Sequence, residues 1–175
     1  LKKEGFVEIQ IPIIQHQELF KNKVGEENNN LMYNFKDRGD RDLCLAPEYT
    51  AVVQQLAKTT FKPQKNVKLF YVQECFRGEK PQNLRWRQFT QLGVEIINPS
   101  KDYSSELIDL TKKLHTFDNN NFEYIINIKR GLDYYKNFTF EIELKDKNIS
   151  VCGGGSYENG IGFAIGIDRL LKMIY

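Results

Sequence analysis

The sequence predicts an α+β fold in which helices flank a mainly antiparallel sheet. Its 175 residues suit one domain with a real core, and 41% of them are hydrophobic, which lies in the globular range. Several segments alternate apolar and polar residues as strands do, while others carry apolar residues on one helical face. No run of about 18 apolar residues occurs, so we expect no transmembrane helix.

Composition narrows the classes of function. Charged residues reach 27%, but the net charge is only +2, so any site for a polyanion must come from local clustering. Cys44, Cys75 and Cys152 lie far apart without CxxC spacing, which favours core residues in a reducing compartment over a disulfide framework or a zinc ribbon. The first residues, LKKEGFVEIQ, lack the apolar region of a signal peptide. We therefore expect a cytoplasmic protein, with an organelle as the alternative.

The first third of the chain predicts short elements. Residues 5–14 alternate, but Pro12 limits them to an edge strand or a strand end. We expect a helical turn at residues 16–20, a mobile loop at 21–30, a strand pair at 32–36 and 42–45 around a turn at 37–40, and a helix at 51–58.

The most informative stretch is residues 76–95, which read FRGEKPQNLRWRQFTQLGVE. Apolar runs at residues 67–72 and 94–97 predict two antiparallel strands joined by a long loop. The basic residues of this loop are Arg77, Lys80, Arg85 and Arg87. Arginine presents a planar fork of donors and keeps its charge, so such a loop suits a polyanionic ligand. A solvated basic hairpin is the alternative.

The second half predicts the remaining strands. We expect an amphipathic helix at residues 103–115, strands at 122–128, 138–144 and 148–152, and a glycine-rich strand that runs into a helix within residues 160–175. Gly153, Gly154 and Gly155 close the strand at 148–152. A glycine triplet is more often a bulge or turn, although it also permits close approach of the backbone to a ligand.

The order of these residues resembles a known family. Phe-Arg-x-Glu, a basic loop and Arg-x-Arg-Gln-Phe-x-Gln-Leu-Gly-x-Glu are similar to motif 2 of class II aminoacyl-tRNA synthetases, in the form found in histidyl-tRNA synthetases. The most family-specific signature is RGLDYY, which begins at Arg130. Residues 5–14 resemble a remnant of motif 1, residues 67–98 motif 2, residues 129–135 the histidine signature and residues 160–175 motif 3. The chain departs from the family pattern at Ala46, Tyr49, Ser156 and Asp168.

The resemblance implies the class II catalytic fold, with a six-stranded type of antiparallel sheet in one domain over residues 1–175. The insertion and anticodon-binding domains of the family are expected to be absent. Family members join histidine to ATP, which gives histidyl-adenylate and pyrophosphate, and then transfer the histidyl group to tRNA(His). ATP and Mg²⁺ are therefore the expected cofactors, and no metal-binding side chain is assigned. The expected partners are L-histidine, the acceptor stem of tRNA(His) and a second copy of the chain, without a membrane.

Residue roles follow from the same resemblance. The catalytic residues are Arg77 and Arg130. The ATP-binding residues are Arg77, Glu79, Arg85, Phe89 and Arg169, of which Phe89 and Arg169 would sandwich adenine. The histidine-binding residues are Glu48, Thr50, Gln91, Glu95, Tyr134 and Tyr135. The residues that approach the tRNA acceptor end are Gln82 and Arg87. Without the resemblance, Glu48 and Thr50 would be read as a helix cap.

Three functions remain open from the sequence. The first is an active histidine–tRNA ligase core, which the matched arginines favour. The second is a paralogue that binds histidine or ATP and regulates another enzyme, which the missing domains favour. The third is a structural or accessory protein, which the departures from the pattern favour.

Overall fold

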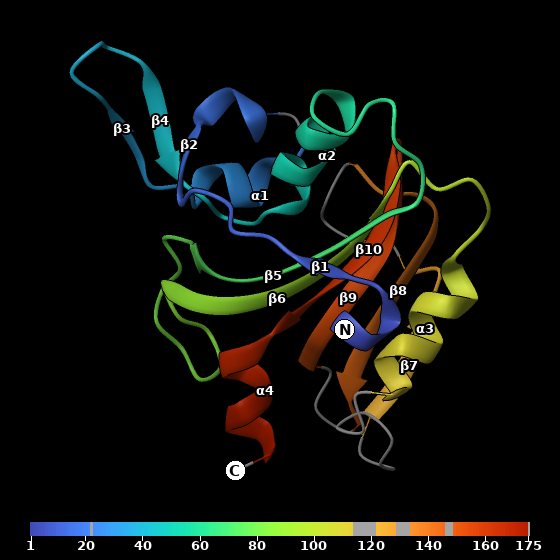
Figure 1. The fold of residues 1–175 in the computed structure, drawn as a ribbon. Helices are drawn as coiled ribbons and strands as arrows, with labels where there is room; N and C mark the ends of the chain where they lie inside the picture. Colours follow the sequence, from blue (N-terminus) through green and yellow to red (C-terminus); the bar gives the residue numbers. More distant parts are fainter. Residues whose placement is uncertain (22, 114–121, 129–133, 146–148, 175) are drawn as a thin grey trace.

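The computed structural model describes residues 1–21, 23–113, 122–128, 134–145 and 149–174, and a curved sheet runs through its centre (Figure 1). Within these residues the sheet has seven strands, in the order β1 (Val7–Glu8), β5 (Val67–Phe76), β6 (Gln88–Ile97), β10 (Gly160–Gly166), β9 (Ile149–Tyr157), β8 (Lys136–Leu144) and β7 (Phe122–Ile126). β1 runs parallel to β5, and every other neighbouring pair is antiparallel. The predicted α+β fold with a mainly antiparallel sheet is confirmed.

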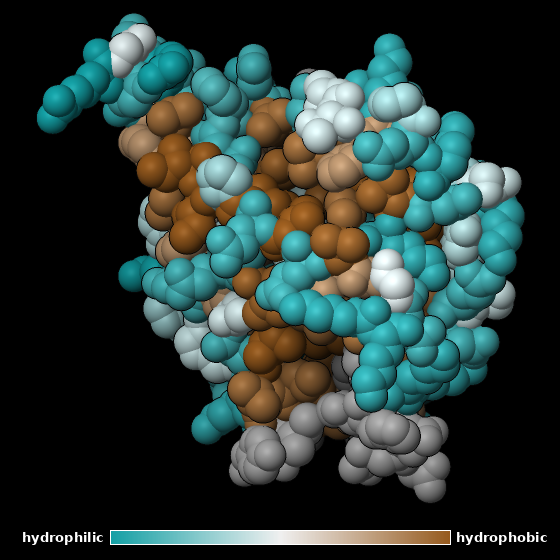
Figure 2. Space-filling view, in the orientation of Figure 1, coloured by the Kyte–Doolittle hydropathy of each residue, from teal (hydrophilic) through white to brown (hydrophobic). Residues whose placement is uncertain are grey.

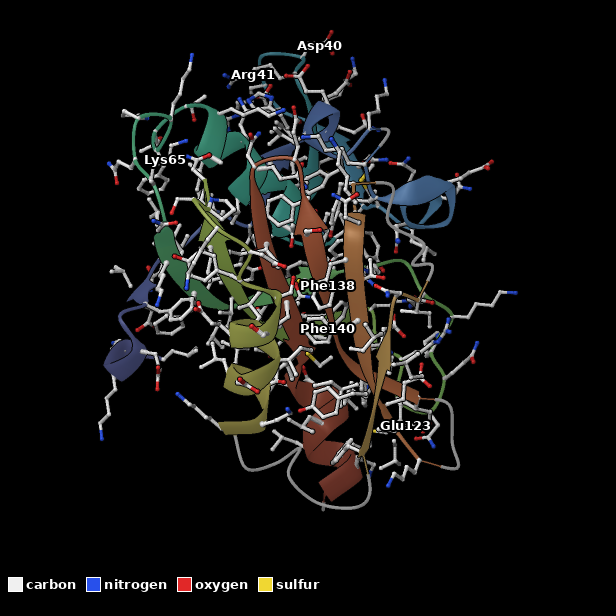
Figure 3. All side chains as sticks on the ribbon, turned by 90° about the vertical axis from the view of Figure 1, so that its right-hand side faces the viewer. Asp40, Arg41, Lys65, Glu123, Phe138 and Phe140 are labelled. Carbon is white, nitrogen blue, oxygen red and sulfur yellow. The ribbon has the colours of Figure 1, made fainter. Side chains whose placement is uncertain are left out.

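Shorter elements cover both faces of this sheet. One face carries a small sheet in the order β2 (Ile14–His16), β4 (Asp42–Leu45) and β3 (Asn34–Lys36), together with η2 (Gln17–Leu19), α1 (Gly25–Asn30) and α2 (Thr50–Lys58). The elements α3 (Ser104–Lys113) and α4 (Ile167–Ile174) lie on the other side, and η1 (Lys2–Glu4) precedes β1 (Figure 1). Figure 3 places Asp40 and Arg41, at the tip of the β3–β4 hairpin, at the opposite end of the molecule from Glu123 of β7.

The alternation of side chains along β6 explains why the sheet separates two cores. Val94 and Ile96 pack with α3 residues such as Leu107, whereas Ile97 packs on the other face with Val53 of α2. Successive side chains of a strand point to opposite faces, so Glu95 belongs to the face that α2 covers. None of the helices in the described part of the chain has the length and apolarity needed to cross a bilayer.

Two predicted segments differ from the structure near the N-terminus. Residues 5–14 bond β5 only through β1 and the Ile9 N–H, which donates to the Phe70 carbonyl at 2.9 Å. The chain then leaves β5, and the Gln73 side chain bonds the Ile11 backbone instead. Residues 25–30, which were expected in a mobile loop, form helix α1. Fully buried Val24 anchors this helix, and the Asn28 side chain donates a 2.8 Å hydrogen bond to the Val24 carbonyl.

The glycine triplet does not close β9 as predicted, because the strand continues through it to Tyr157. A Cβ atom at Gly154 would lie 2.4 Å from the Gly162 carbonyl oxygen, and one at Gly155 would lie 2.5 Å from the Phe138 carbonyl oxygen. The neighbouring strands approach too closely for side chains at these positions. Gly154 and Gly155 are therefore required by the close packing of the neighbouring strands and not by a turn.

Candidate active site

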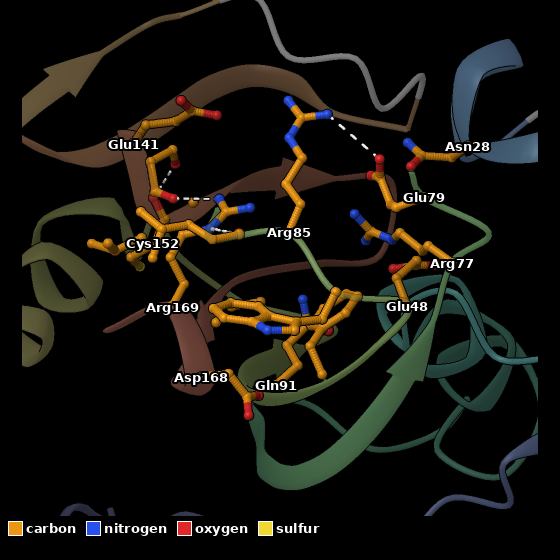
Figure 4. A pocket seen from close by; sticks show the side chains of 18 of the residues that line it. Asn28, Glu48, Arg77, Glu79, Arg85, Gln91, Glu141, Cys152, Asp168 and Arg169 are labelled. Atoms are coloured by element: carbon orange, nitrogen blue, oxygen red, sulfur yellow. Dashed lines mark hydrogen bonds and ion pairs between the residues drawn. The ribbon is translucent and has the colours of Figure 1, made fainter. Parts of the chain in front are cut away.

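A cavity of about 270 Å³ opens on the face of the main sheet. Its floor includes Gly153 of β9 with Ala164 and Gly166 of β10, which leave the sheet nearly bare of side chains. Figure 4 shows Arg77, Arg85 and Arg169 around this hollow; the first two come from the loop after β5 and the third from α4. Three guanidinium groups at one hollow make a site for an anion.

The structure brings most of the predicted ATP and histidine residues to this cavity. The predicted residues that line it are Glu48, Thr50, Arg77, Glu79, Arg85, Phe89, Gln91, Tyr134, Tyr135 and Arg169. They come from α2 and the turn before it, from both ends of the loop between β5 and β6, from β6 itself, from residues before β8, and from α4. These elements are far apart in the chain, so the fold is what assembles the cavity.

Glu95 lies behind the cavity wall in a network of hydroxyl groups. The Thr50 hydroxyl donates to its Oε1 and the Tyr157 hydroxyl donates to its Oε2, both at 2.8 Å. Gly162 pairs with Glu95 across the strands, and a Cβ atom there would lie 1.9 Å from Oε2. Glycine at this position is what gives the Glu95 carboxyl group its space.

Glu48 occupies the start of α2. Its two carboxyl oxygens accept hydrogen bonds from the backbone N–H groups of Thr50 at 2.8 Å and Ala51 at 2.9 Å. The Tyr134 hydroxyl donates to Glu48 at 3.3 Å, and the Tyr134 and Tyr135 rings lie 4.7 Å apart. Glu48 therefore caps the helix and also faces the cavity, so the two interpretations of this residue are compatible.

Burial controls the protonation of both carboxyl groups. It raises the pKa of Glu95 to about 8, against the opposing effect of the hydrogen bonds from Thr50 and Tyr157. Burial also raises the pKa of Glu48, which the Ala51 N–H and the charge of Arg77 oppose. Near neutral pH, Glu95 can thus offer a proton as well as accept one.

Arg77 is held close to the predicted adenine site. Its Nε donates a 2.9 Å hydrogen bond to the Pro47 carbonyl, and its guanidinium group lies 5.2 Å from the centre of the Phe89 ring. Arg169, which was predicted to sandwich adenine together with Phe89, donates to the Leu84 carbonyl at 3.1 Å and to the Ser150 carbonyl at 2.6 Å. The adenine sandwich of Phe89 and Arg169 stays a prediction.

The remaining predicted residues lie outside the cavity wall. Gln82 exchanges backbone hydrogen bonds with Arg85 in the turn of the loop, and Arg87 donates from Nε to the Glu79 carbonyl at 3.2 Å. Both are exposed. Arg130 lies outside the described residues, as do residues 129–133 of the predicted histidine signature.

Sequence reasoning missed several residues of the cavity wall. They include Asn28, Trp86, Glu141, Ser150, Cys152 and Asp168. Asp168 accepts a hydrogen bond from the Thr90 backbone N–H, which ties α4 to β6. Strand alternation could have indicated Glu141, because it pairs with Gly153 on the floor. Asn28 had no such signal, since residues 25–30 were expected in a loop.

The described residues hold no group of three or more His, Cys, Asp or Glu side chains that could bind a metal ion. The cavity wall instead combines three arginines with Glu79 and Glu141. This donor set fits an anionic ligand that brings its own cation, and we assign no metal-binding side chain.

Solved structures define the class of the fold. The chain superimposes on apo histidyl-tRNA synthetase from S. aureus with a TM-score of 0.74 at 29% identity, covering 99% of this chain and 61% of that one. It also superimposes on an ATP phosphoribosyltransferase regulatory subunit/histidyl-tRNA synthetase from Bacillus halodurans with a TM-score of 0.78, covering 98% and 75% of the two chains, and here 15% identity shows the fold alone. The fold is that of a class II aminoacyl-tRNA synthetase catalytic core.

Sequence comparisons define the family. The histidyl-tRNA synthetase family model matches residues 1–122. The histidine–tRNA ligase of Methanococcus vannielii is 37% identical over an alignment of 286 residues, covering 97% of this chain and 68% of that protein. The chain belongs to the histidyl-tRNA synthetase family. Its alignments cover between 27% and 68% of the length of these curated relatives. The alignment of 286 residues with the Methanococcus vannielii protein includes positions that have no counterpart among the 175 residues of this chain.

Proposed function

We propose that residues 1–175 form a single catalytic domain that activates histidine with ATP and transfers the histidyl group to tRNA(His). The observation that carries the proposal is one cavity with two chemically different ends. Buried Glu48 and Thr50 lie at one end with Arg77 beside Glu48, and Arg85 and Arg169 lie toward the other. An amino acid and a nucleoside triphosphate need such a pair of neighbouring sites.

The buried end suits histidine. The oxygens of Glu48, Thr50 and Gln91 can accept hydrogen bonds from the α-ammonium group. Thr50 lines the cavity and bonds to Glu95, so we propose that the imidazole takes over this hydrogen bond to Glu95. Tyr134 and Tyr135 enclose the ring. An apolar isostere of histidine could not replace the hydrogen bond that Thr50 gives to Glu95, which disfavours its binding.

The arginine end suits ATP. Attack of the histidine carboxylate on the α-phosphate gathers negative charge, which positioned cations stabilise. We assign Arg77 to the α-phosphate, Arg85 and Arg169 to the outer phosphates, Glu79 to nucleotide orientation and Phe89 to the adenine. Arg130 would supply a second cation at the α-phosphate. Mg²⁺ on the phosphates would neutralise part of their charge.

We propose that the macromolecular partners bind at exposed surfaces of the domain. Exposed Gln82 and Arg87, on the loop between β5 and β6, would approach the acceptor stem of tRNA(His). Large apolar side chains are exposed at Val7 of β1, Ile14 of β2 and Val72 of β5. Figure 2 shows apolar surface gathered on the face that these elements present. Such a surface suits a second copy of the chain, so we propose a homodimer.

A second candidate is a regulatory paralogue that binds histidine or ATP without charging tRNA. The observation in its favour is the fold shared with the Bacillus halodurans protein, which is described as a regulatory subunit. The two candidates differ in chemistry, because only the enzyme makes and breaks the bond to the α-phosphate.

Histidine-dependent exchange between ATP and pyrophosphate tests the proposal. We expect exchange by the unaltered chain, and a loss of about 100-fold or more in Arg77→Ala, because a positioned donor to the reacting phosphate is removed. Arg38→Ala is the matched control, since Arg38 is exposed on the β3–β4 hairpin. No exchange above the level of Arg77→Ala would exclude the enzyme and leave the regulatory paralogue. Exchange without charging of tRNA(His) would indicate another acceptor.

A further inference from the structure

Tyr71 of β5 carries a buried hydroxyl group that the proposed histidine site does not include. The side chain is fully buried, and its hydroxyl has no hydrogen-bond partner among the residues that the structure describes. Its ring packs against that of Tyr49 with the ring centres 5.3 Å apart, and the Tyr49 hydroxyl donates to the Glu74 carbonyl at 2.8 Å. A buried hydroxyl without a partner costs stability, whereas phenylalanine would fill the same space without that cost.

The tip of the Tyr71 ring lies over the middle of β6. Gly93 pairs with Tyr71 across the two strands, and a Cβ atom at Gly93 would lie 2.2 Å from the Tyr71 hydroxyl oxygen. On its other side Gly93 pairs with Ala164 of β10, which lines the cavity. Glu95 lies two residues further along β6 and therefore faces the same side of the sheet as Gly93. The hydroxyl is thus one strand away from the cavity floor, beside the buried end of the site.

The groups around this hydroxyl belong to the proposed histidine site. Burial raises the pKa of Tyr71 well above its usual value, and the charges of Glu95 and Glu48 raise it further, so the hydroxyl keeps its proton. The Thr50 hydroxyl opposes part of this rise and so lies beside Tyr71, without the geometry of a hydrogen bond. Thr50 instead donates to Glu95 at 2.8 Å in this structure.

We propose that Tyr71 is a positioning residue of the histidine site, whose oxygen accepts a hydrogen bond from Thr50 when the imidazole of histidine takes the place of Thr50 at Glu95. This inference rests on the proposed function, because it deepens the account of the same site. A buried donor that loses its acceptor would offset the bond that the ligand gains, so the displaced Thr50 hydroxyl needs a second acceptor close by. Tyr71 supplies that acceptor and makes the exchange of partners at Glu95 favourable.

Tyr71→Phe tests the proposal, because it removes the hydroxyl and keeps the ring. We expect the affinity for L-histidine, measured by calorimetry, to fall by about 5- to 100-fold, because the displaced Thr50 hydroxyl is left without an acceptor. The affinity for ATP should not change. The midpoint of urea unfolding without ligands should stay the same or rise, because an unpartnered group leaves the core. A lower midpoint with an unchanged histidine affinity would assign the hydroxyl to the free fold and overturn the proposal.

Tyr49→Phe is the matched control, because it removes a hydroxyl of the same kind from the ring that packs on Tyr71. It should lower the midpoint of unfolding and leave the histidine affinity as it is, since its hydroxyl donates to the Glu74 carbonyl and not to Thr50 or Glu95. An equal loss of histidine affinity in Tyr49→Phe and Tyr71→Phe would show a general effect of the core and contradict the role of Tyr71.

Thr50→Val tests whether Tyr71 acts through Thr50. In the Thr50→Val background, Tyr71→Phe should weaken histidine binding by less than about twofold, because the donor that needs Tyr71 is already gone. An undiminished loss in that background would refute this route. If the unaltered chain binds no histidine, the proposed function fails as well. If the unaltered chain and Tyr71→Phe bind histidine equally, only the role of Tyr71 fails.

Discussion

At the scale of single residues, Glu95 shows how burial makes one carboxyl group sensitive to pH. Its pKa rises from an ordinary 4.5 to about 8 in the folded chain. The folded state therefore binds more protons than the unfolded state between these values. The contribution to stability is complete below pH 4.5 and is lost as the pH rises through about 8.

We expect Glu95→Gln to remove this pH dependence, because an amide does not titrate. The free energy of unfolding of the unaltered chain should fall by about 3 kcal/mol relative to the variant between pH 5 and pH 8. Urea unfolding at several pH values measures the difference. The matched control is Glu26→Gln, since Glu26 is exposed on α1 and its variant should follow the unaltered chain. Parallel curves for Glu95→Gln and the unaltered chain would contradict the prediction.

Gly162 gives a second test at this scale. Gly162→Ala would place a Cβ atom 1.9 Å from the Glu95 carboxyl oxygen and 2.4 Å from the Val94 carbonyl oxygen. We expect the free energy of unfolding to fall by about 1–3 kcal/mol, because the strands must separate. The control is Gly166→Ala on the same strand, where the nearest atom, Cβ of Arg169, lies at 3.8 Å. Equal effects of the two changes would show that the contact with Glu95 is not the cause.

At the scale of elements, the Gln73 side chain supplies the hydrogen bonds that a neighbouring strand would otherwise give to the Ile11 backbone. Its Oε1 accepts from the Ile11 N–H at 2.7 Å, and its Nε2 donates to the Ile11 carbonyl at 2.5 Å. We expect Gln73→Ala to cost about 1–3 kcal/mol of stability, because the buried Ile11 backbone loses its partners. Hydrogen exchange at Ile11 should also become faster. Gln88→Ala is the control, since the exposed Gln88 side chain donates to the Glu74 carboxyl group and contacts no backbone at Ile11. Unchanged exchange at Ile11 in Gln73→Ala would refute this account.

Periodicity predicted the elements that bury one face and failed where tertiary contacts decide. The helix predicted at residues 51–58, the helix predicted at 103–115, which α3 matches within the described residues, and the strand pair on either side of residues 37–40 were predicted from their own residues. Helix α1 was not, because its sequence GEENNN is polar and its anchor is Val24, just before it. The glycine triplet was wrongly expected to end a strand. The contacts that require glycine there come from β8 and β10, which the local sequence of the triplet does not reveal.

At the scale of the whole molecule, motif order predicted more of the site than local pattern did. Glu48, Arg77, Tyr134 and Arg169 are separated by long stretches of chain, yet they line one cavity, as the family resemblance required. The contact of the Arg77 guanidinium group with the Phe89 ring could not be read from the sequence. It depends on the Pro47 carbonyl, which holds the Arg77 guanidinium group.

Self-association is the remaining property that belongs to the whole molecule. Val7 of β1, Ile14 of β2 and Val72 of β5 expose 61%, 54% and 52% of their surface, and large exposed apolar side chains favour burial against another protein surface. We expect concentration-dependent dimers by sedimentation velocity. Val7→Lys and Val72→Lys should each weaken the dimer at least tenfold, because each would bury an unpaired charge that costs more than about 1.4 kcal/mol. Ile126→Lys is the control, since Ile126 is 46% exposed on β7, at the opposite edge of the sheet from β1. If Ile126→Lys weakens the dimer as much as the other two changes do, the interface lies elsewhere. A monomer at every concentration would refute the proposed dimer.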